Sequence, residues 1–173
     1  MEDSQPRGGV TPRAVAAQVC EALNQSGAHY LVIGGIACIL HGVVRGTEDV
    51  DILIERTLEN AGRVLHGLSR IGYGFAREWA PEELLRRPIT IVGDDPAVDV
   101  FTVAWTIRYE GALAGSSLVE VEGVRIPVIG IDDLIATKRT SRASDAADIE
   151  ILEEIKRLRE HPRNTAPGIP GSA

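Results

Sequence analysis

Residues 31–55 read LVIGGIACILHGVVRGTEDVDILIE and contain two short apolar runs separated by a polar turn. The first run stops at a glycine pair, Gly34 and Gly35, and a small-residue segment of helical character follows it. The second run carries two carboxylates, Asp49 and Asp51. This order predicts a strand, a glycine turn, a short helix and a second strand.

The two carboxylates of the second run belong to one face of the predicted strand. Side chains two residues apart in a strand point the same way, so Asp49 and Asp51 project together while Val50 projects to the opposite, buried side. Far downstream, residues 97–103 read AVDVFTV and place Asp99 in the same alternation. If the two strands are neighbours, Asp99 lies ~5 Å across from one of the pair. The sequence therefore predicts three carboxylates on one sheet face.

Three clustered carboxylates need a compensating charge, since two unit charges ~4 Å apart repel by about 4 kcal/mol at an effective dielectric near ~20. Protons, basic side chains or a hard divalent cation can offset this repulsion. Mg²⁺ prefers oxygen ligands and leaves positions open for substrate phosphates, and a pair of such ions can hold the attacking and leaving oxygens of phosphoryl transfer. In the alternative interpretation, these are surface aspartates paired with Arg45 or Arg125.

The glycine pair lies where the predicted strand meets the helix. Without Cβ atoms the backbone can approach a ligand closely and expose its N–H groups, and the following helix N-terminus favours an anion. This arrangement suits the β- and γ-phosphates of a nucleotide; the alternative is an ordinary tight turn. Neither G-x-G-x-x-G nor G-x-x-x-x-G-K-[ST] is present, which removes the main support for a Rossmann or P-loop protein.

The remaining patterns predict an α/β or α+β fold with a mixed β-sheet flanked by helices. Helices are expected from Thr11, from Thr57 and from Pro81, and over residues 132–139 and 144–160. Strands are expected over residues 29–33 and 49–54, and as two hairpins over 89–92 with 97–103 and 118–121 with 124–128. The last helix is predicted to bury one apolar stripe. That stripe consists of Ile151, Ile155 and Leu158, widened by Ile149 and Leu152.

Length and composition predict one soluble domain over residues 11–161, with tails over 1–10 and 162–173. No apolar run approaches the ~20 residues of a membrane span, and the polar N-terminus is unlike a secretory signal. Cys20 and Cys38 lie in apolar contexts without paired spacing, as expected of reduced cysteines in the cytoplasm. The formal charge of −7 argues against a basic footprint for duplex DNA.

The pattern G-G-x-A-x-x-x-H-G-x-x-R-x-T-x-D-x-D over residues 34–51 resembles the signature of the DNA polymerase beta-type nucleotidyltransferase superfamily. The closer likeness is to its small prokaryotic branch of AbiEii-like toxins and minimal nucleotidyltransferases. Residues 131–152, IDDLIATKRTSRASDAADIEIL, resemble the C-terminal D-L-I-x-x-K and D-x-x-D-I pattern of that branch. The likeness covers roughly residues 28–155.

This resemblance implies transfer of a nucleoside monophosphate from an NTP, ATP or GTP, to an acceptor hydroxyl. Asp49 and Asp51 would ligate two Mg²⁺ ions, with Mn²⁺ as a substitute, and Asp99 would complete one site and help deprotonate the acceptor. Gly34, Gly35, Arg45 and Thr47 would hold triphosphate oxygens, and Lys138 would bring a positive charge to them. The acceptor would be tRNA, a protein or a small molecule, and an antitoxin would be a partner.

Two other interpretations stay open at the level of sequence. Many active members of the superfamily have Ser at the glycine turn where this chain has Gly35 or Ile36, so a catalytically weak or inactive module that binds nucleotide or a partner is the first alternative. A structural domain with salt-bridged carboxylates is the second. Lys138 can also lie on a solvated helix face, and Asp145 and Asp148 can serve as helix-capping carboxylates.

Overall fold

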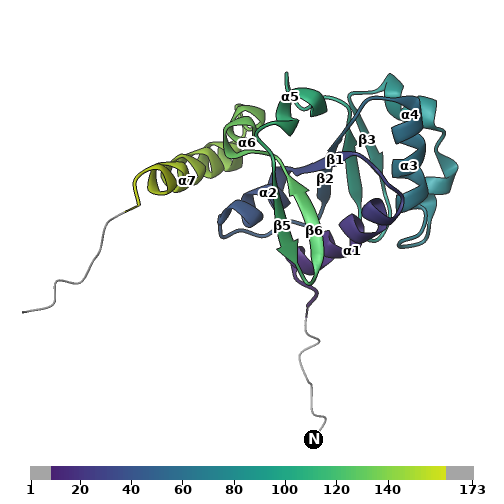
Figure 1. The fold of residues 1–173 in the computed structure, drawn as a ribbon, viewed down its shortest axis with the longest axis horizontal. Coiled ribbons are helices and arrows are strands. Elements are labelled where there is room, and N and C mark those ends of the chain that lie inside the picture. Colours follow the sequence, from purple (N-terminus) through teal and green to yellow (C-terminus); the bar gives the residue numbers. More distant parts are fainter. Residues whose placement is uncertain (1–8, 163–173) are drawn as a thin grey trace, which may run out of the picture.

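The computed structural model describes residues 9–162 and contains a six-stranded mixed β-sheet with helices packed on it (Figure 1). The strands lie in the order β3-β4-β2-β1-β6-β5. Their bounds are β1 Tyr30–Ile33, β2 Val50–Ile54, β3 Ile89–Val92, β4 Val98–Phe101, β5 Ser117–Val121 and β6 Val124–Val128. The helices of the described range are α1 Pro12–Gln25, α2 Gly34–His41, α3 Leu58–Leu68, α4 Pro81–Arg86, α5 Tyr109–Leu113, α6 Ile131–Thr137 and α7 Ala143–Glu160, with a 3-10 turn at Phe75–Glu78. The predicted mixed sheet flanked by helices is confirmed.

The predicted tails, residues 1–10 and 162–173, lie outside the described range except for residues 9, 10 and 162. None of the helices within residues 9–162 combines the length and the apolar character needed to cross a membrane. Cys20 and Cys38 are both buried and free, as their apolar contexts predict.

The sheet pairs its strands in both directions. β1 runs antiparallel to β2 and parallel to β6, and β2 runs parallel to β4. The β3–β4 and β5–β6 pairs are the two predicted hairpins. The parallel pairing places Asp51 opposite Asp99 and Val50 opposite Val98. The two acidic strands are therefore neighbours inside the sheet, which confirms the condition on which the predicted carboxylate cluster depended.

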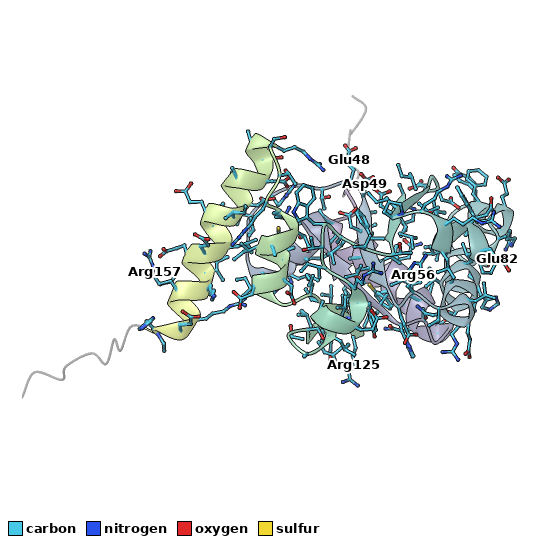
Figure 2. The ribbon with its side chains drawn as sticks, turned by 90° about the horizontal axis from the view of Figure 1, so that it is seen from above. Glu48, Asp49, Arg56, Glu82, Arg125 and Arg157 are labelled. Carbon is cyan, nitrogen blue, oxygen red and sulfur yellow. The ribbon has the colours of Figure 1, made fainter. Side chains whose placement is uncertain are left out.

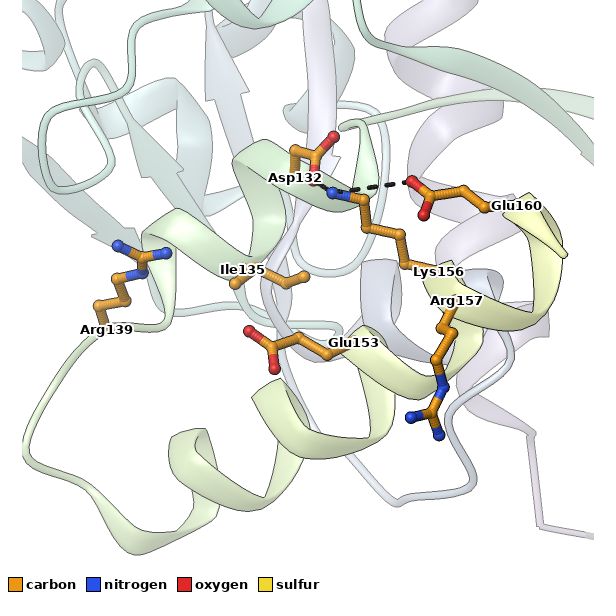
Figure 3. A pocket seen from close by; sticks show the side chains of 7 residues that line it. All are labelled: Asp132, Ile135, Arg139, Glu153, Lys156, Arg157 and Glu160. Carbon is orange, nitrogen blue, oxygen red and sulfur yellow. Dashed lines mark hydrogen bonds and ion pairs between the residues drawn. The ribbon is translucent and has the colours of Figure 1, made fainter.

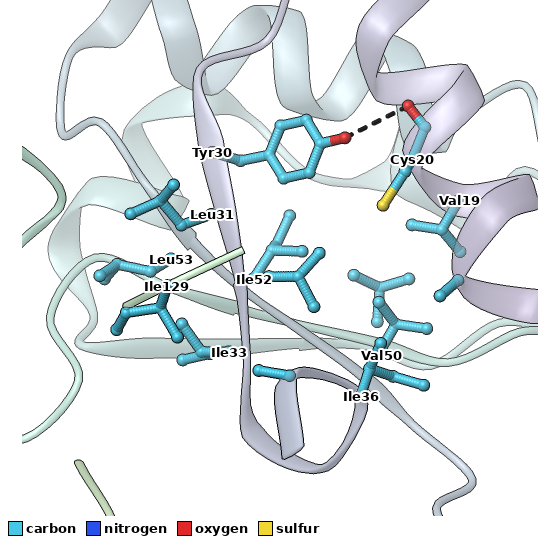
Figure 4. Close-up of a cluster of buried hydrophobic side chains, with 14 of the residues drawn as sticks. Val19, Cys20, Tyr30, Leu31, Ile33, Ile36, Val50, Ile52, Leu53 and Ile129 are labelled. Atoms are coloured by element: carbon cyan, nitrogen blue, oxygen red, sulfur yellow. Dashed lines mark hydrogen bonds between the residues drawn. The ribbon is translucent and has the colours of Figure 1, made fainter. Parts of the chain in front are cut away.

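Alternation along the central strands sends their apolar side chains into the core (Figure 4). Val50 and Ile52 are fully buried, as the period-two pattern predicts. On the same side, Val19 and Cys20 of α1 approach the strands, and the hydroxyl of Tyr30 donates a hydrogen bond to the carbonyl of Cys20 at 3.3 Å. Because most side chains of these short strands are buried, few of them can reach the surface, and the strand register decides which ones do.

Local signals set the ends of several helices. The Thr11 hydroxyl accepts a hydrogen bond from the backbone N–H of Ala14 at 3.2 Å, and Pro12 occupies the first position of α1. Thr57 caps α3 in the same way. Gly42 ends α2 in the left-handed conformation, with φ of 115°, which glycine adopts at low cost. These helix starts and this helix end agree with the sequence-based prediction.

The stripe through which α7 packs differs from the predicted one. Ile151 and Leu158, predicted to be buried, are 43% and 44% exposed. Leu152 is fully buried, and Ile149 and Ile155 are partly buried against the core. The physical reason is that two carboxylates on the same side of α7 are buried in ion pairs with α6 and the segment before β2. Those pairs hold the helix in a rotation that turns the other two aliphatic residues outward.

Replacing Leu152 by Ala is expected to lower the free energy of unfolding by ~2–5 kcal/mol, because a fully buried leucine leaves a cavity when truncated. Ile151→Ala on the exposed side of the same helix is the matched control and is expected to change stability by roughly 0.5 kcal/mol or less. Urea unfolding followed by circular dichroism measures both variants. Equal losses would contradict the observed packing of α7.

Candidate functional site

The three predicted carboxylates belong to two neighbouring strands, β2 with the residue before it and β4. Asp51 and Asp99 occupy directly paired positions on the two strands. Asp49 lies one residue before β2, because the strand begins at Val50 and not at Asp49 as predicted. The backbone N–H of Val50 donates to the carbonyl of Ala97 at 3.1 Å, which joins the starts of the two strands.

Burial and the charges of neighbouring carboxylates raise the pKa values of Asp51 and Asp99. The pKa of Asp51 is raised from 3.8 to about 6, first by burial and then by the charges of Asp99 and Asp49, while Lys138 and the backbone amide of Gly35 act in the opposite direction. Burial and the charge of Asp49 also raise the pKa of Asp99. The charge of Lys138 therefore compensates only in part for the burial of Asp51 and for the carboxylates near it.

Arginines do not neutralise this cluster. Within residues 9–162, none of the three carboxylates forms an ion pair with a basic side chain. Arg45, one of the two arginines considered as partners, pairs with Asp148 of α7 instead. Arg125, the other, lies on the far side of the molecule from Asp49 (Figure 2). The interpretation as salt-bridged surface aspartates is therefore wrong for both arginines.

The donor set fits a hard divalent cation by its chemistry. Within residues 9–162, no three His, Cys, Asp or Glu side chains are grouped closely enough, as they stand, to hold a metal ion. Carboxylate oxygens are nevertheless the ligands that Mg²⁺ prefers, and the raised pKa of Asp51 reflects a repulsion that a cation would relieve. Asp49 is exposed, so its side chain is free to change rotamer. The residues present therefore fit a cation that three carboxylates share.

Mg²⁺ is expected to stabilise the folded protein more at pH 8 than at pH 5. Because the pKa of Asp51 is about 6 in the folded chain against an ordinary 3.8, the folded state binds this proton more tightly. Ionisation of Asp51 therefore costs stability as the pH rises through that interval, and a cation offsets the cost only where the carboxylate is ionised. At a free concentration ~100-fold above Kd the gain is about 2.7 kcal/mol. Thermal unfolding with Mg²⁺ or EDTA at both pH values measures it, and equal shifts would contradict the site.

The glycine pair allows side chains of the site to approach the backbone. Gly34 has φ of +62°, and a Cβ atom there would lie 2.8 Å from Cγ of Asp51. A Cβ atom on Gly35 would lie 2.8 Å from the hydroxyl of Thr47. Both distances are shorter than a normal contact. The first turn of α2 has no side-chain cap, and the backbone N–H of Gly35 donates a hydrogen bond to the carboxylate of Asp51. Phosphate binding at this turn stays a prediction.

Lys138 is buried. The interpretation in which it lies on a solvated helix face with Asp132 and Asp133 is therefore wrong. Its ammonium pairs with Asp148 at 2.8 Å and with Asp145 at 3.4 Å, both on α7. Capping alone therefore does not describe these two aspartates. Their i, i+3 spacing puts them on one side of the helix. Two carboxylates at this spacing beside an aliphatic stripe are the sequence signal that indicates their burial.

Two hollows in the surface bear on the site. Thr47 and Asp49 line one of about 280 Å³, together with Ile36 of α2 and Pro12 and Val15 of α1. Another, of about 390 Å³, lies between α6 and α7 and contains none of the predicted site residues (Figure 3). The chemistry of the first hollow, not the size of the second, makes it the better candidate for a ligand.

Comparison with family models and with curated proteins finds no match to this sequence. Among solved structures, an antigenic nucleotidyltransferase-like protein from Paracoccidioides brasiliensis matches with a TM-score of 0.55 and 16% identity, over 84% of this chain and 75% of its own. The lincosamide antibiotic adenylyltransferase LnuA, solved with lincomycin bound, matches with a TM-score of 0.55 and 15% identity, over 85% of this chain and 99% of its own. The mixed sheet and its helices therefore form a nucleotidyltransferase-like fold.

Proposed function

We propose that this protein is a Mg²⁺-dependent nucleotidyltransferase that moves a nucleoside monophosphate from ATP or GTP to an acceptor hydroxyl. The observation that carries the proposal is the pairing of Asp51 with Asp99 on adjacent parallel strands, with Asp49 just before β2. Within residues 9–162 none of the three carboxylates forms an ion pair. The glycine turn against Asp51 and the nucleotidyltransferase-like fold support the same assignment.

Asp49, Asp51 and Asp99 would hold one or two Mg²⁺ ions, or Mn²⁺ in their place. When bound, such ions neutralise phosphate charge and polarise the reacting phosphoryl group. In the transfer step, the acceptor oxygen forms a bond to the α-phosphorus. The bond between that phosphorus and the oxygen that bridges it to the β-phosphate breaks. Pyrophosphate leaves, and Asp99 accepts the proton of the acceptor hydroxyl.

The remaining predicted residues would bind the triphosphate. Backbone amides of Gly34 and Gly35 would face its oxygens at the start of α2, where the helix dipole favours an anion. The hydroxyl of Thr47 would add a donor from the wall of the same hollow. Arg45 and Lys138 would supply the positive charge that stabilises the departing pyrophosphate.

A small molecule is the acceptor class that this assignment favours among tRNA, a protein side chain and a small molecule. The formal charge of −7 disfavours a large polyanion, and LnuA, which shares the fold, was solved with lincomycin. A role as the toxin of a toxin–antitoxin pair, with an antitoxin as partner, rests on the sequence resemblance alone.

Incubation of the protein with α-labelled NTPs, Mg²⁺ and cell extract tests the assignment. Label transfer that disappears in Asp49→Ala and Asp99→Ala supports the enzyme and identifies base and acceptor together. Binding of ATP or GTP without any transfer favours the alternative, a module that has lost turnover. Absence of both binding and transfer overturns the proposal.

A further inference from the structure

Asp148 of α7 joins two basic side chains that come from distant parts of the chain. It accepts hydrogen bonds from Nη1 of Arg45, in the segment before β2, and from Nζ of Lys138, just after α6, the second at 2.8 Å. Asp145 lies one helical turn earlier and 3.4 Å from the same ammonium. The Asp148 and Lys138 side chains are each 8% exposed. Among residues 9–162, Asp148 is the one side chain that pairs with both cations.

This cluster lies next to the candidate site and not apart from it. Helices α6 and α7 both pack against α2, the helix that begins at the glycine turn, and Arg45 lies two residues before Thr47, whose hydroxyl faces Gly35. The charge of Lys138 also reaches the carboxylate of Asp51. Of the two cations held by Asp148, Lys138 therefore acts on one of the proposed metal-binding carboxylates, and Arg45 adjoins the segment that carries Thr47 and Asp49.

Stability alone does not account for such an arrangement. Buried ion pairs contribute little net stability, because desolvation of the charges offsets most of their attraction, and apolar residues of similar volume often serve as well. What a buried carboxylate provides is a fixed place for the cations paired with it. A lysine side chain left free would otherwise sample many rotamers and lose considerable conformational entropy on meeting a ligand.

We propose that Asp148 is a positioning residue that holds Arg45 and Lys138 ready for the β- and γ-phosphates of the NTP, with Asp145 as a weaker second support on Lys138. This inference rests on the proposed nucleotidyltransferase function. It assigns to α7 a part in triphosphate recognition, without contact between α7 and the nucleotide.

Asp148→Asn removes the charge at nearly constant shape, and Asp148→Glu keeps the charge on a longer side chain. Asp145→Asn leaves the Asp148 pairs intact and weakens the support on Lys138 at 3.4 Å, together with the contacts of Asp145 to Thr140 and Arg142. The matched control is Asp132→Asn, since Asp132 pairs with Lys156 at 2.6 Å and likewise ties α6 to α7 (Figure 3), but is 72% exposed and forms no ion pair with Lys138. Calorimetry with Mg²⁺ gives the affinity of each variant for ATP, GTP and AMP, and the labelling reaction gives KM and kcat.

Asp148→Asn is expected to weaken NTP binding at least ~10-fold and to lower kcat/KM roughly 100-fold, because misplacement of a charged group by about 1 Å has effects of this size. AMP, which lacks the β- and γ-phosphates, should bind Asp148→Asn and the wild type equally well, a contrast that a merely structural role would not produce. Asp148→Glu should recover part of the lost affinity, Asp145→Asn should show a smaller loss, and Asp132→Asn should match the wild type.

Unchanged or tighter NTP binding by Asp148→Asn overturns the positioning role while the proposed function stands. A wild-type protein that binds no NTP and transfers no label overturns both. A parallel loss of ATP and AMP binding also overturns it, because it reports general damage to the fold. If Asp148→Asn does not fold, Asp145→Asn decides, since an NTP affinity equal to that of the wild type contradicts the proposal.

Discussion

Replacing Asp51 by Asn is expected to reduce nucleotidyl transfer by roughly 1,000-fold and, at the same time, to stabilise the metal-free protein at pH 8. The first effect follows because an amide cannot supply the negative charge that a shared divalent cation requires. The second follows because ionised Asp51 is held at a raised pKa of about 6 against an ordinary 3.8. Removing that charge returns up to roughly 3 kcal/mol above pH 6, since one pKa unit corresponds to about 1.4 kcal/mol.

The labelling reaction measures the first effect, and urea unfolding in EDTA at pH 8 and pH 5 measures the second. Roughly half of the stabilisation should remain at pH 5, because the folded wild type must take up a proton there that the unfolded chain, with its ordinary pKa of 3.8, does not bind. Glu82→Gln is the control, because Glu82 is an exposed acidic residue that lies away from Asp49 (Figure 2) and should change neither quantity. A destabilised Asp51→Asn protein would mean that the carboxylate already has a favourable partner.

Gly34→Ala is expected to lower transfer roughly 100-fold and to destabilise the fold by ~1–3 kcal/mol. An alanine at φ of +62° adopts the left-handed conformation, at a cost of roughly 1–2 kcal/mol. Its methyl group would also lie 2.8 Å from Cγ of Asp51 and displace that carboxylate from its place opposite Asp99. Displacement of about 1 Å is enough for a loss of this size.

Gly46→Ala provides the control for this substitution, because a Cβ atom at Gly46 meets no atom within 4 Å. A double-mutant cycle separates the two causes. In an Asp51→Ala background the contacts with the carboxylate are gone and only the Cβ of residue 51 at 3.0 Å remains, so Gly34→Ala should cost little more than its backbone strain. An identical cost in both backgrounds would show that Gly34 serves the turn and does not make room for the carboxylate.

The alternation of the acidic strands made part of this site predictable. A period of two is an intrinsic property of an extended chain, so the pattern around Asp51 and Asp99 fixed which side chains share a face before their partners were known. The sequence predicts a cluster only if the two acidic strands are neighbours, because neither strand's sequence specifies which strand it pairs with. The structure supplied that condition through the parallel register of β2 and β4.

The side of α7 that packs inward was not predictable by the same reasoning. Hydrophobic periodicity favoured burial of Ile151 and Leu158, but the helix buries Leu152 together with Asp145 and Asp148. Carboxylates are buried only where cations meet them, and here the cations come from segments far away in the sequence. Charges that are satisfied through tertiary contacts override a pattern that counts only apolar residues.

The parallel register of β2 and β4 also determines where the chain can gain or lose residues without disturbing the site. Extra residues in the connection from α3 to β3 shift neither strand along its axis, so loops there can lengthen while Asp51 and Asp99 stay side by side. One added residue inside β4 would instead exchange the two faces of the strand, so that Asp99 would point into the packed interior and Val100 toward solvent. Insertions and deletions among chains of this fold should therefore occur mainly in the connection between β2 and β4 and rarely within the two strands.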